Sequence, residues 1–423
     1  MSDDLLTNCM RCGLCLPACP TYLLTGLEKS SPRGRIRLMK AVDQEEMKIT
    51  NGFTYEMNFC LDCQACESVC PAGVKYGSLV ESARAQIADS GFESWTTKML
   101  RWLLLRKLFE VPHALALSVR MLRFIEMSGM ATLLRKTRFL SLFSENLHQA
   151  LGLLPAVSKR PSSKTLLKKA VFTTAKQIRI GFLTGCVMDV LFADVNADTV
   201  ELLEHHGCEV IIPCEQGCCG SLQAHNGDPV TARTLAAQNV RAFSGQGLDT
   251  IVMNSAGCGA FMKQYAALFE DDPELAAPAA ELAAKTKDIS EFLFDVGLRV
   301  RSTSQVSVPR KRVTYHDACH LVHSQKVSEQ PRQLLRSIPS TEYVELPEAT
   351  WCCGSAGIYN ITHAETASEL LDRKMENIKR IAPDIIVTGN PGCLLQLQQG
   401  LDERGLHVEL LHLATFLRRT CCD

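Results

Sequence analysis

The spacing of apolar residues divides the chain into a helical part and a part in which short strands alternate with helices. Between residues 95 and 130 apolar side chains recur at every third or fourth position, with breaks at Pro112 and Gly129, which predicts helices. The apolar faces of these helices can pack within the protein, against a partner or on a membrane, and the sequence pattern does not distinguish these alternatives. A stretch rich in Pro, Ser and Lys at 151–165 is typical of a linker. From residue 178 onward, strand and helix patterns alternate, which predicts a parallel sheet covered by helices.

The second half of the chain contains an internal repeat. "IRIGFLTGCVMD" at Ile178 resembles "KRVTYHDACHLV" at Lys311, and "QGCCGSLQAH" and "TIVMNSAGC" resemble "TWCCGSAGIY" and "DIIVTGNPGC". The matching cysteines are separated by 133, 134 and 135 residues. A repeat this regular predicts two copies of one α/β domain.

Each copy carries four cysteines in loops that follow predicted strands. Because the carboxyl ends of parallel strands meet at one edge of a sheet, the four thiols of a copy are predicted to converge there. The first set comprises Cys186, Cys218, Cys219 and Cys258, and the second comprises Cys319, Cys352, Cys353 and Cys393. Four thiolates suit an iron–sulfur cluster or a zinc ion, and four reduced buried thiols are the alternative.

The first 71 residues contain one cysteine spacing twice, Cys-x-x-Cys-x-x-Cys-x-x-x-Cys-Pro. It is the spacing of bacterial ferredoxins, in which three sulfurs of a run bind one cluster and the fourth binds the other. The sequence therefore predicts one [4Fe–4S] cluster on Cys9, Cys12, Cys15 and Cys70, and a second on Cys60, Cys63, Cys66 and Cys19. Zinc and disulfides fit less well, since zinc prefers separated Cys-x-x-Cys pairs.

The forty residues between the two runs contain a predicted helix capped by Ser31, and another helix is predicted to end at Gly91. The cluster-binding domain is therefore expected to be helical. Arg33, Arg35 and Arg37 lie on the first of these helices. They either offset the negative charge of the clusters or form an ordinary solvated face.

The composition narrows the class of protein. The chain has 423 residues, of which 46% are hydrophobic. Its formal net charge is only −1, so it lacks the strong positive charge that would favour binding to nucleic acid. The segment "MSDDLLTN" lacks the basic and apolar regions of a signal peptide, and no apolar run is long enough to span a membrane. We therefore expect a cytoplasmic protein with reduced thiols, with peripheral attachment to the inner face of the cell membrane as an alternative.

The remaining cysteines are predicted to be structural. Cys208 is expected in the core at the start of a strand, and Cys421 and Cys422 at a fraying terminus. Cys214 lies four residues before Cys218 and is near enough in sequence to reach that site.

Three histidines lie close in sequence to the predicted cysteine sites, namely His225, His316 and His320. We expect each to hydrogen-bond a loop rather than to bind metal or transfer a proton. His316 and His320 flank Cys319 in the second copy only, so the two copies are not expected to be chemically equivalent.

Over nearly its full length the chain resembles the iron–sulfur subunit of glycolate oxidase, a family with one ferredoxin domain and two cysteine-rich CCG domains. The resemblance is carried by "SPRGRI", both cysteine runs, "HDACH", "WCCGSAG" and "TGNPGC". It implies an α + α/β protein. The implied parts are an α-helical ferredoxin domain with two 4Fe-4S motifs over 1–92, a helical connector over 93–175, and CCG domains over 176–305 and 306–420.

The resemblance also implies a function. A separate FAD-containing 2-hydroxyacid dehydrogenase subunit, with glycolate as the leading substrate, would pass electrons through this chain toward a quinone-type acceptor. The chain has neither a GxGxxG fingerprint nor a GxxxxGK[ST] loop, so the flavin is expected on the partner. Within an oxidoreductase complex it is thus a subunit that does not oxidise the hydroxyacid alone, and no catalytic residue is assigned. Alternatives are the iron–sulfur subunit of a lactate or glycerol-3-phosphate dehydrogenase and a heterodisulfide-reductase-like thiol–disulfide subunit.

One departure from the related heterodisulfide reductase pattern concerns the last motif of each CCG domain. That pattern closes with Cys-x-x-Cys, whereas the first position here is Ser255 in one copy and Asn390 in the other. Each site therefore lacks one thiolate, which argues against a five-thiolate cluster and against disulfide cleavage. An ordinary cluster, zinc and an empty site all stay open for either copy.

Overall fold

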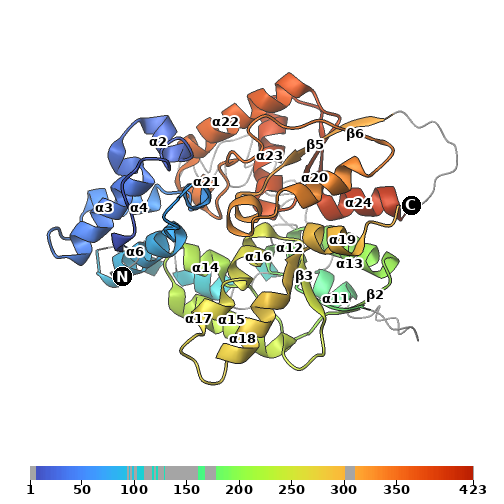
Figure 1. The fold of residues 1–423 in the computed structure, drawn as a ribbon, viewed down its shortest axis with the longest axis horizontal. Coiled ribbons are helices and arrows are strands. Elements are labelled where there is room, and N and C mark those ends of the chain that lie inside the picture. Colours follow the sequence, from blue (N-terminus) through green and yellow to red (C-terminus); the bar gives the residue numbers. More distant parts are fainter. Residues whose placement is uncertain are drawn as a thin grey trace. The chain divides into compact units, whose positions relative to one another are not determined.

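A computed structural model describes residues 6–92, 178–300 and 310–422, together with short pieces at 95, 98–99, 102–108, 117–118, 121, 128 and 161–166. The chain forms two compact units (Figure 1). Unit 1 comprises Met1–Lys107 and Gly220–Thr234, and unit 2 comprises Leu108–Cys219 and Leu235–Asp423. Most of the predicted helical connector, 93–175, lies outside the described residues.

Unit 1 is helical in its described residues. Its elements are α2 (Pro20–Thr25), η1 (Glu28–Ser30), α3 (Pro32–Asp43), α4 (Asn51–Asn58), α5 (Ala65–Ser68), α6 (Tyr76–Asp89) and α14 (Ser221–His225), with the π-helix η2 (Trp102–Leu108) at its boundary. The predicted helix start is confirmed, because Ser31 accepts a hydrogen bond from the Gly34 backbone N–H and Pro32 opens α3. The second predicted helix is α6, which ends at Asp89, close to Gly91.

The core of unit 1 forms where α3, α4 and α6 meet. Met39, Met57 and Leu79 are fully buried there, and Phe53 and Ile87 are nearly so. Gly34 permits the close approach of α3 to η1, because a Cβ at this position would lie 1.9 Å from the Glu28 carbonyl oxygen. The helices thus form a rigid support for the two cysteine loops.

Unit 2 contains two four-stranded sheets whose paired strands are all parallel, as the alternation of strands and helices predicted. The first sheet has the order β2-β1-β3-β4 and the second the order β6-β5-β7-β8. Their strands are β1 (Ile178–Phe182), β2 (Cys208–Ile211), β3 (Thr250–Met253), β4 (Thr286–Asp288), β5 (Lys311–His316), β6 (Thr341–Tyr343), β7 (Ile385–Thr388) and β8 (Glu409–His412). The identical order confirms that the internal repeat is a structural repeat, and we call the two copies the first and second modules.

Helices surround both sheets. In the first module they are α11 (Ser162–Leu166), α12 (Val187–Leu191), α13 (Ala193–His205), α15 (Pro229–Phe243, which begins in unit 1), α16 (Ala256–Met262), α17 (Tyr265–Leu268), α18 (Ala276–Lys285) and α19 (Ile289–Val296). In the second they are η4 (His320–Ser324), α20 (Glu329–Arg336), α21 (Tyr359–Thr362), α22 (Ala364–Ile381), α23 (Pro391–Glu403) and α24 (Leu413–Cys421).

One hydrophobic core joins the two modules. It contains strand residues of both sheets, such as Val252 and Val387, and residues of α24, such as Leu417. The prediction that the carboxyl terminus frays around Cys421 is wrong, because Cys421 lies at the end of α24 and is fully buried in this core. The amphipathic character of α24 outweighs its terminal position. The prediction for Cys208 is confirmed, since it is buried as the first residue of β2.

Candidate cofactor sites

The two cysteine runs of unit 1 line two cavities, and each cavity combines cysteines of both runs. The first cavity is lined by Cys9, Cys12, Cys15 and Cys70. Cys12 is exposed and the other three are half-buried. Arg11 and Gly13 have positive φ angles of 55° and 85°, which bend the loop around the cavity. Arg33 also lines this cavity and donates a hydrogen bond to the Arg11 carbonyl oxygen over 3.2 Å.

The second cavity is lined by Cys19, Cys60, Cys63 and Cys66, all of which are buried. Its loop turns at Asp62 and Gln64, whose φ angles are 51° and 59°. The Asp62 backbone N–H donates to the Cys60 Sγ over 3.4 Å, and the Tyr76 hydroxyl donates to the same sulfur over 3.6 Å. Burial raises the pKa of the Cys66 thiol well above its usual value, so thiolates here need a bound cation to persist.

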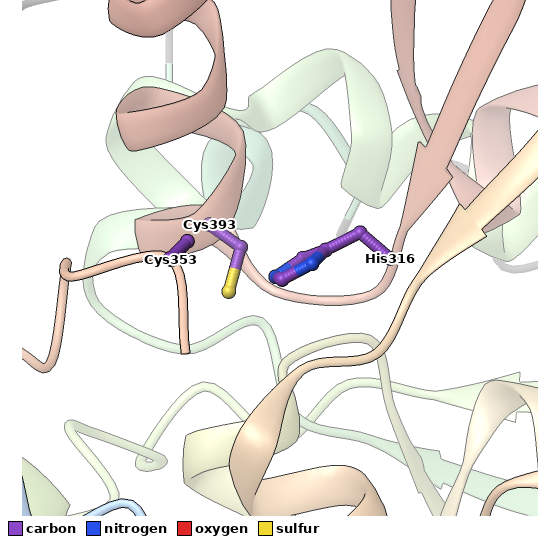
Figure 2. A group of neighbouring side chains, drawn as sticks. All are labelled: His316, Cys353 and Cys393. Carbon is purple, nitrogen blue, oxygen red and sulfur yellow. The ribbon is translucent and has the colours of Figure 1, made fainter. Parts of the chain in front are cut away.

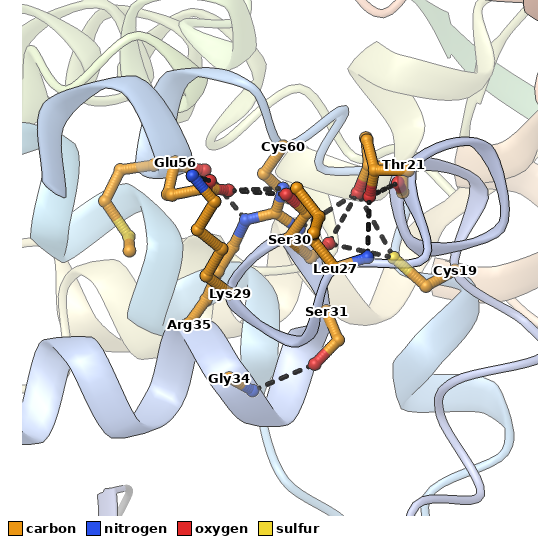
Figure 3. A network of polar contacts seen from close by, with 12 residues as sticks. Cys19, Thr21, Leu27, Lys29, Ser30, Ser31, Gly34, Arg35, Glu56 and Cys60 are labelled. Carbon is orange, nitrogen blue, oxygen red and sulfur yellow. Dashed lines mark hydrogen bonds and ion pairs between the residues drawn. The ribbon is translucent and has the colours of Figure 1, made fainter. Parts of the chain in front are cut away.

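Arg35 supplies a fixed positive charge beside the second cavity, which it lines. Its side chain is fully buried, donates to the Glu56 carbonyl oxygen over 2.7 Å and to Thr21 Oγ1 over 3.1 Å, and lies 3.7 Å from the Glu56 carboxylate (Figure 3). Arg37, by contrast, forms a surface ion pair with Glu46. Of the three predicted arginines, two therefore line the cavities and one is solvated.

Both cavities fit [4Fe–4S] clusters by their donor chemistry. Each offers four cysteine sulfurs, and the second also offers hydrogen-bond donors directed at a sulfur and a buried guanidinium. Such donors and charges are the features that stabilise an anionic cluster and set its potential.

In the first module the four predicted cysteines lie together. Cys186 precedes α12, Cys258 lies in α16, and the Cys218–Cys219 pair precedes Gly220, whose φ is 91°. A hydrogen bond with Cys218, followed by burial, raises the pKa of Cys186 well above its usual value. Hydrogen bonds with Cys218 and Cys258, followed by burial, likewise raise the pKa of Cys219 well above its usual value.

The turn of the first module is held by neutral groups. Asn239, fully buried on α15, accepts from the Gly217 N–H and donates to the Cys218 carbonyl oxygen, both over 2.9 Å. The Tyr265 hydroxyl donates to the Cys219 carbonyl oxygen over 2.6 Å. Ser255, at the position of the missing cysteine, hydrogen-bonds Cys258; together with the stronger bond from Cys219, it lowers the pKa of Cys258. Cys214 is exposed and hydrogen-bonds Glu215.

In the second module the cysteines have different neighbours. Cys353 lies within hydrogen-bond reach of Cys352 and Cys393, and the Asn390 side-chain amide donates to Cys393 Sγ over 3.6 Å. Cys319 is half-buried and immediately precedes η4. His316, at the end of β5, is buried with its ring beside the Cys353 and Cys393 thiols (Figure 2).

The second module also contains a buried cation. Lys374 on α22 is fully buried, donates to the Glu348 and Ala349 carbonyl oxygens, and lies near Cys352 and Cys353. Burial lowers the pKa of Lys374 to about 8, and the nearby Cys353, Asp317 and Cys352 side chains oppose this shift. In the first module, a neutral residue, Asn239 on α15, contacts the CCG turn instead.

The expectation that the histidines hydrogen-bond loops is confirmed for His225, which bonds Asp62 in the loop of the second cysteine run, and fails for His316. His225 lies in unit 1, where its Nδ1 is 3.0 Å from Asp62 and 2.6 Å from Glu81; these hydrogen bonds overcome the opposite effect of burial and raise its pKa to about 10. His316 has no hydrogen bond at either ring nitrogen among the described residues. The signal that could have revealed His316 is its place at the carboxyl end of a central strand, where sites of parallel sheets form.

Comparisons with known proteins agree with this architecture. Family models match as a 4Fe-4S dicluster domain over 5–74, as the linker region of the glycolate oxidase iron–sulfur subunit over 96–154, and as a cysteine-rich domain over 180–263 and 313–398. The chain is 40% identical to a probable glycolate oxidase iron–sulfur subunit of Bacillus subtilis, covering 99% of this chain and 94% of the relative. It belongs to the family of glycolate oxidase iron–sulfur subunits.

Two further relatives are similar to most of this chain. The glycolate oxidase iron–sulfur subunit of Escherichia coli is 30% identical over 94% of this chain and 90% of its own length. One of the subunits of a CoM/CoB fumarate reductase of Methanothermobacter marburgensis is 30% identical over 95% of this chain and 69% of its own. No helix among the described residues is long and apolar enough to cross a membrane.

Proposed function

We propose that this chain is the iron–sulfur electron-transfer subunit of an FAD-linked 2-hydroxyacid oxidase or dehydrogenase, with glycolate as the leading substrate. The observation that carries the proposal is the pair of cavities in unit 1, each lined by three cysteines of one run and the last cysteine of the other. The two relatives named as glycolate oxidase iron–sulfur subunits, which match over nearly the whole chain, favour glycolate. Electrons would enter from a flavoprotein subunit and leave toward a quinone-type acceptor.

In this proposal the cysteines of each cavity are the cluster ligands. Cys9, Cys12, Cys15 and Cys70 hold one [4Fe–4S] cluster, and Cys19, Cys60, Cys63 and Cys66 hold the other. Bound clusters of this type accept and release single electrons. Arg35 and the Tyr76 hydroxyl stabilise negative charge in the second cavity, and burial excludes water from it. The modules are proposed to carry further iron–sulfur or zinc sites that draw ligands from Cys186, Cys218, Cys219 and Cys258 in the first and from Cys319, Cys352, Cys353 and Cys393 in the second.

We assign electron exchange with the partner protein to the first cavity. Cys12 is exposed, and the apolar side chains of Met10 and Leu14 that line this cavity are 67% and 55% exposed. Exposed apolar groups beside a redox group suit a protein partner. Replacing Leu14→Glu is expected to slow reduction by the flavoprotein roughly tenfold with both clusters intact. Val230→Glu, a matched change at another exposed apolar residue, should leave the rate unchanged.

The central test combines reconstitution with ligand replacement. Anaerobically purified chain should contain about eight irons in unit 1, and Cys70→Ser should damage the cluster of the first run rather than that of the second.

Without the flavoprotein subunit the chain should oxidise no 2-hydroxyacid, and with it glycolate should reduce an artificial acceptor. Turnover by the isolated, flavin-free chain would overturn the proposal. Reduction of heterodisulfides by the chain when it is supplied with an artificial electron donor, without the flavoprotein, would favour the thiol–disulfide alternative, to which the name of the CoM/CoB relative draws attention.

A further inference from the structure

The second module contains three buried side chains arranged as ligands of a single metal ion. A ring nitrogen of His316 and the thiols of Cys353 and Cys393 all lie within 4.8 Å of one another. His316 is only 1% exposed, and neither of its ring nitrogens has a hydrogen-bond partner among the described residues. A buried polar group without a partner costs about 1–3 kcal/mol, so this orientation needs a compensating interaction.

The three side chains are held by separate rigid elements. His316 ends β5 and pairs with Thr388 of β7, whose hydroxyl donates to the His316 carbonyl oxygen over 3.0 Å. Cys393 lies in the first turn of α23, and Cys353 precedes Gly354, whose φ of 92° sets the turn. Figure 2 shows the His316 ring extending toward the Cys393 thiol and ending beside it. Their convergence is therefore built into the sheet and its loops.

The spacing suits one ion better than a cluster. Zinc binds sulfur at about 2.3 Å and imidazole nitrogen at about 2.0–2.1 Å, so two of its ligands are at most about 4.6 Å apart. Each thiolate of a cubane binds a different iron and stands further from its neighbours. The observed separations need only a small contraction to close around zinc.

Cys352 lies within hydrogen-bond reach of Cys353 and is the candidate for the fourth ligand. With Cys352 as a thiolate ligand, the charge of the site matches that of a nearby buried cation. One zinc ion with three thiolates and a neutral imidazole carries a net charge of −1, and the buried Lys374 ammonium beside Cys352 and Cys353 balances it. We propose that the second module holds a zinc ion through His316, Cys353, Cys393 and Cys352, a site that differs from the all-cysteine set expected from the sequence. This site does not depend on the proposed electron transfer.

The first module has no histidine at the position that corresponds to His316. Leu183 lies three residues before Cys186, as His316 lies three before Cys319, and offers no ligand atom. The proposed site is therefore specific to the second module.

The test uses the full chain, purified anaerobically with its clusters in place. Metal analysis is expected to find about one zinc per chain, and zinc X-ray absorption a shell of one nitrogen and three sulfurs. His316→Ala should lower zinc occupancy at least tenfold, whereas His320→Ala should leave it unchanged. Reduced-state EPR of the unit 1 clusters should be the same in all these proteins.

Further variants keep the result interpretable. If His316→Ala does not fold, His316→Cys should retain zinc and convert its shell to four sulfurs. Cys353→Ser should remove zinc, and Cys219→Ser should not. Wild-type chain without zinc, an all-sulfur zinc shell, or zinc that is lost with Cys219→Ser would each overturn the proposal. None of these outcomes would alter the test of the proposed function, which reads flavoprotein-dependent turnover.

Discussion

The two modules of unit 2 share their backbone and differ in the chemistry around their cysteines. The sheets have the same strand order, and the CCG turns have the same geometry, with φ values of 91° at Gly220 and 92° at Gly354. Around this turn the first module places Asn239 and a group of thiols, whereas the second places Lys374 and His316. A repeated fold therefore fixes where thiols converge, and a few neighbouring side chains decide what they can bind.

The shared turn should be the feature least tolerant of change. A Cβ at Gly354 would lie 2.6 Å from the Ala367 carbonyl oxygen, in a backbone conformation that other residues rarely adopt. Gly354→Ala is expected to destabilise the second module by about 4 kcal/mol, from conformational strain and overpacking together. Urea unfolding followed by tryptophan fluorescence, to which Trp351 of this module contributes, measures this. Gly405→Ala is the control, because φ there is 60° and nothing lies within 4 Å of an added Cβ; equal losses would show that overlap with Ala367 is unimportant.

The next largest effects are expected at the side chains near the turn, Lys374 in the second module and Asn239 in the first. Lys374→Met removes a buried ammonium and leaves the nearby thiols without a counter-charge, which should cost about 3 kcal/mol. Asn239→Leu leaves the Gly217 N–H and the Cys218 carbonyl unpaired and should cost about 2 kcal/mol. Only the Lys374 change should also release metal from the second module. A Lys374 variant that is as stable and as metal-loaded as wild type would remove this distinction.

The sequence predicted the parts of these sites that depend on local spacing. The cysteine runs identify their cavities because each loop contributes three sulfurs within seven residues, and the repeat identifies the paired modules. Lys374 could not be foreseen, because it lies on a helix more than twenty residues from Cys352 and reaches the site only through packing. The error at Cys421 has the same origin, since the tertiary core rather than the terminal position decides its burial.

The junction of the modules should respond to acid. His412 of the second module accepts from the Ala414 N–H at Nδ1, so its Nε2 donates to the Asn254 carbonyl oxygen of the first module over 2.8 Å. Burial lowers the pKa of His412 to about 4, although the bond to Asn254 opposes this. The folded-state pKa lies below the unfolded value of about 6.5, so the stabilisation is present above pH 6.5 and is lost as pH falls toward 4.

This linkage should remove about 2 kcal/mol of unfolding free energy between pH 7 and pH 5. Urea titrations of wild type and His412→Gln at both pH values measure the difference, because glutamine can donate to Asn254 but does not titrate. The variant should lose about 2 kcal/mol less than wild type over this interval. An identical loss in both proteins would show that His412 does not carry the pH dependence of the junction.

The smallest expected effect concerns the positions at which each module lacks a cysteine. Ser255 hydrogen-bonds Cys258, and Asn390 donates to Cys393 over 3.6 Å, so in both modules a hydrogen-bond donor replaces the missing thiolate. Donors to a ligand sulfur stabilise its thiolate form and help to retain the metal. Ser255→Ala and Asn390→Ala should therefore each speed chelator-driven metal loss about tenfold, or about 1.4 kcal/mol, in their own module only. Ser244→Ala, which removes the hydrogen bond from Ser244, the residue after α15, to the Val240 carbonyl oxygen, is the control. If neither change alters the release rate, the hydrogen bonds of the two residues do not help to retain metal.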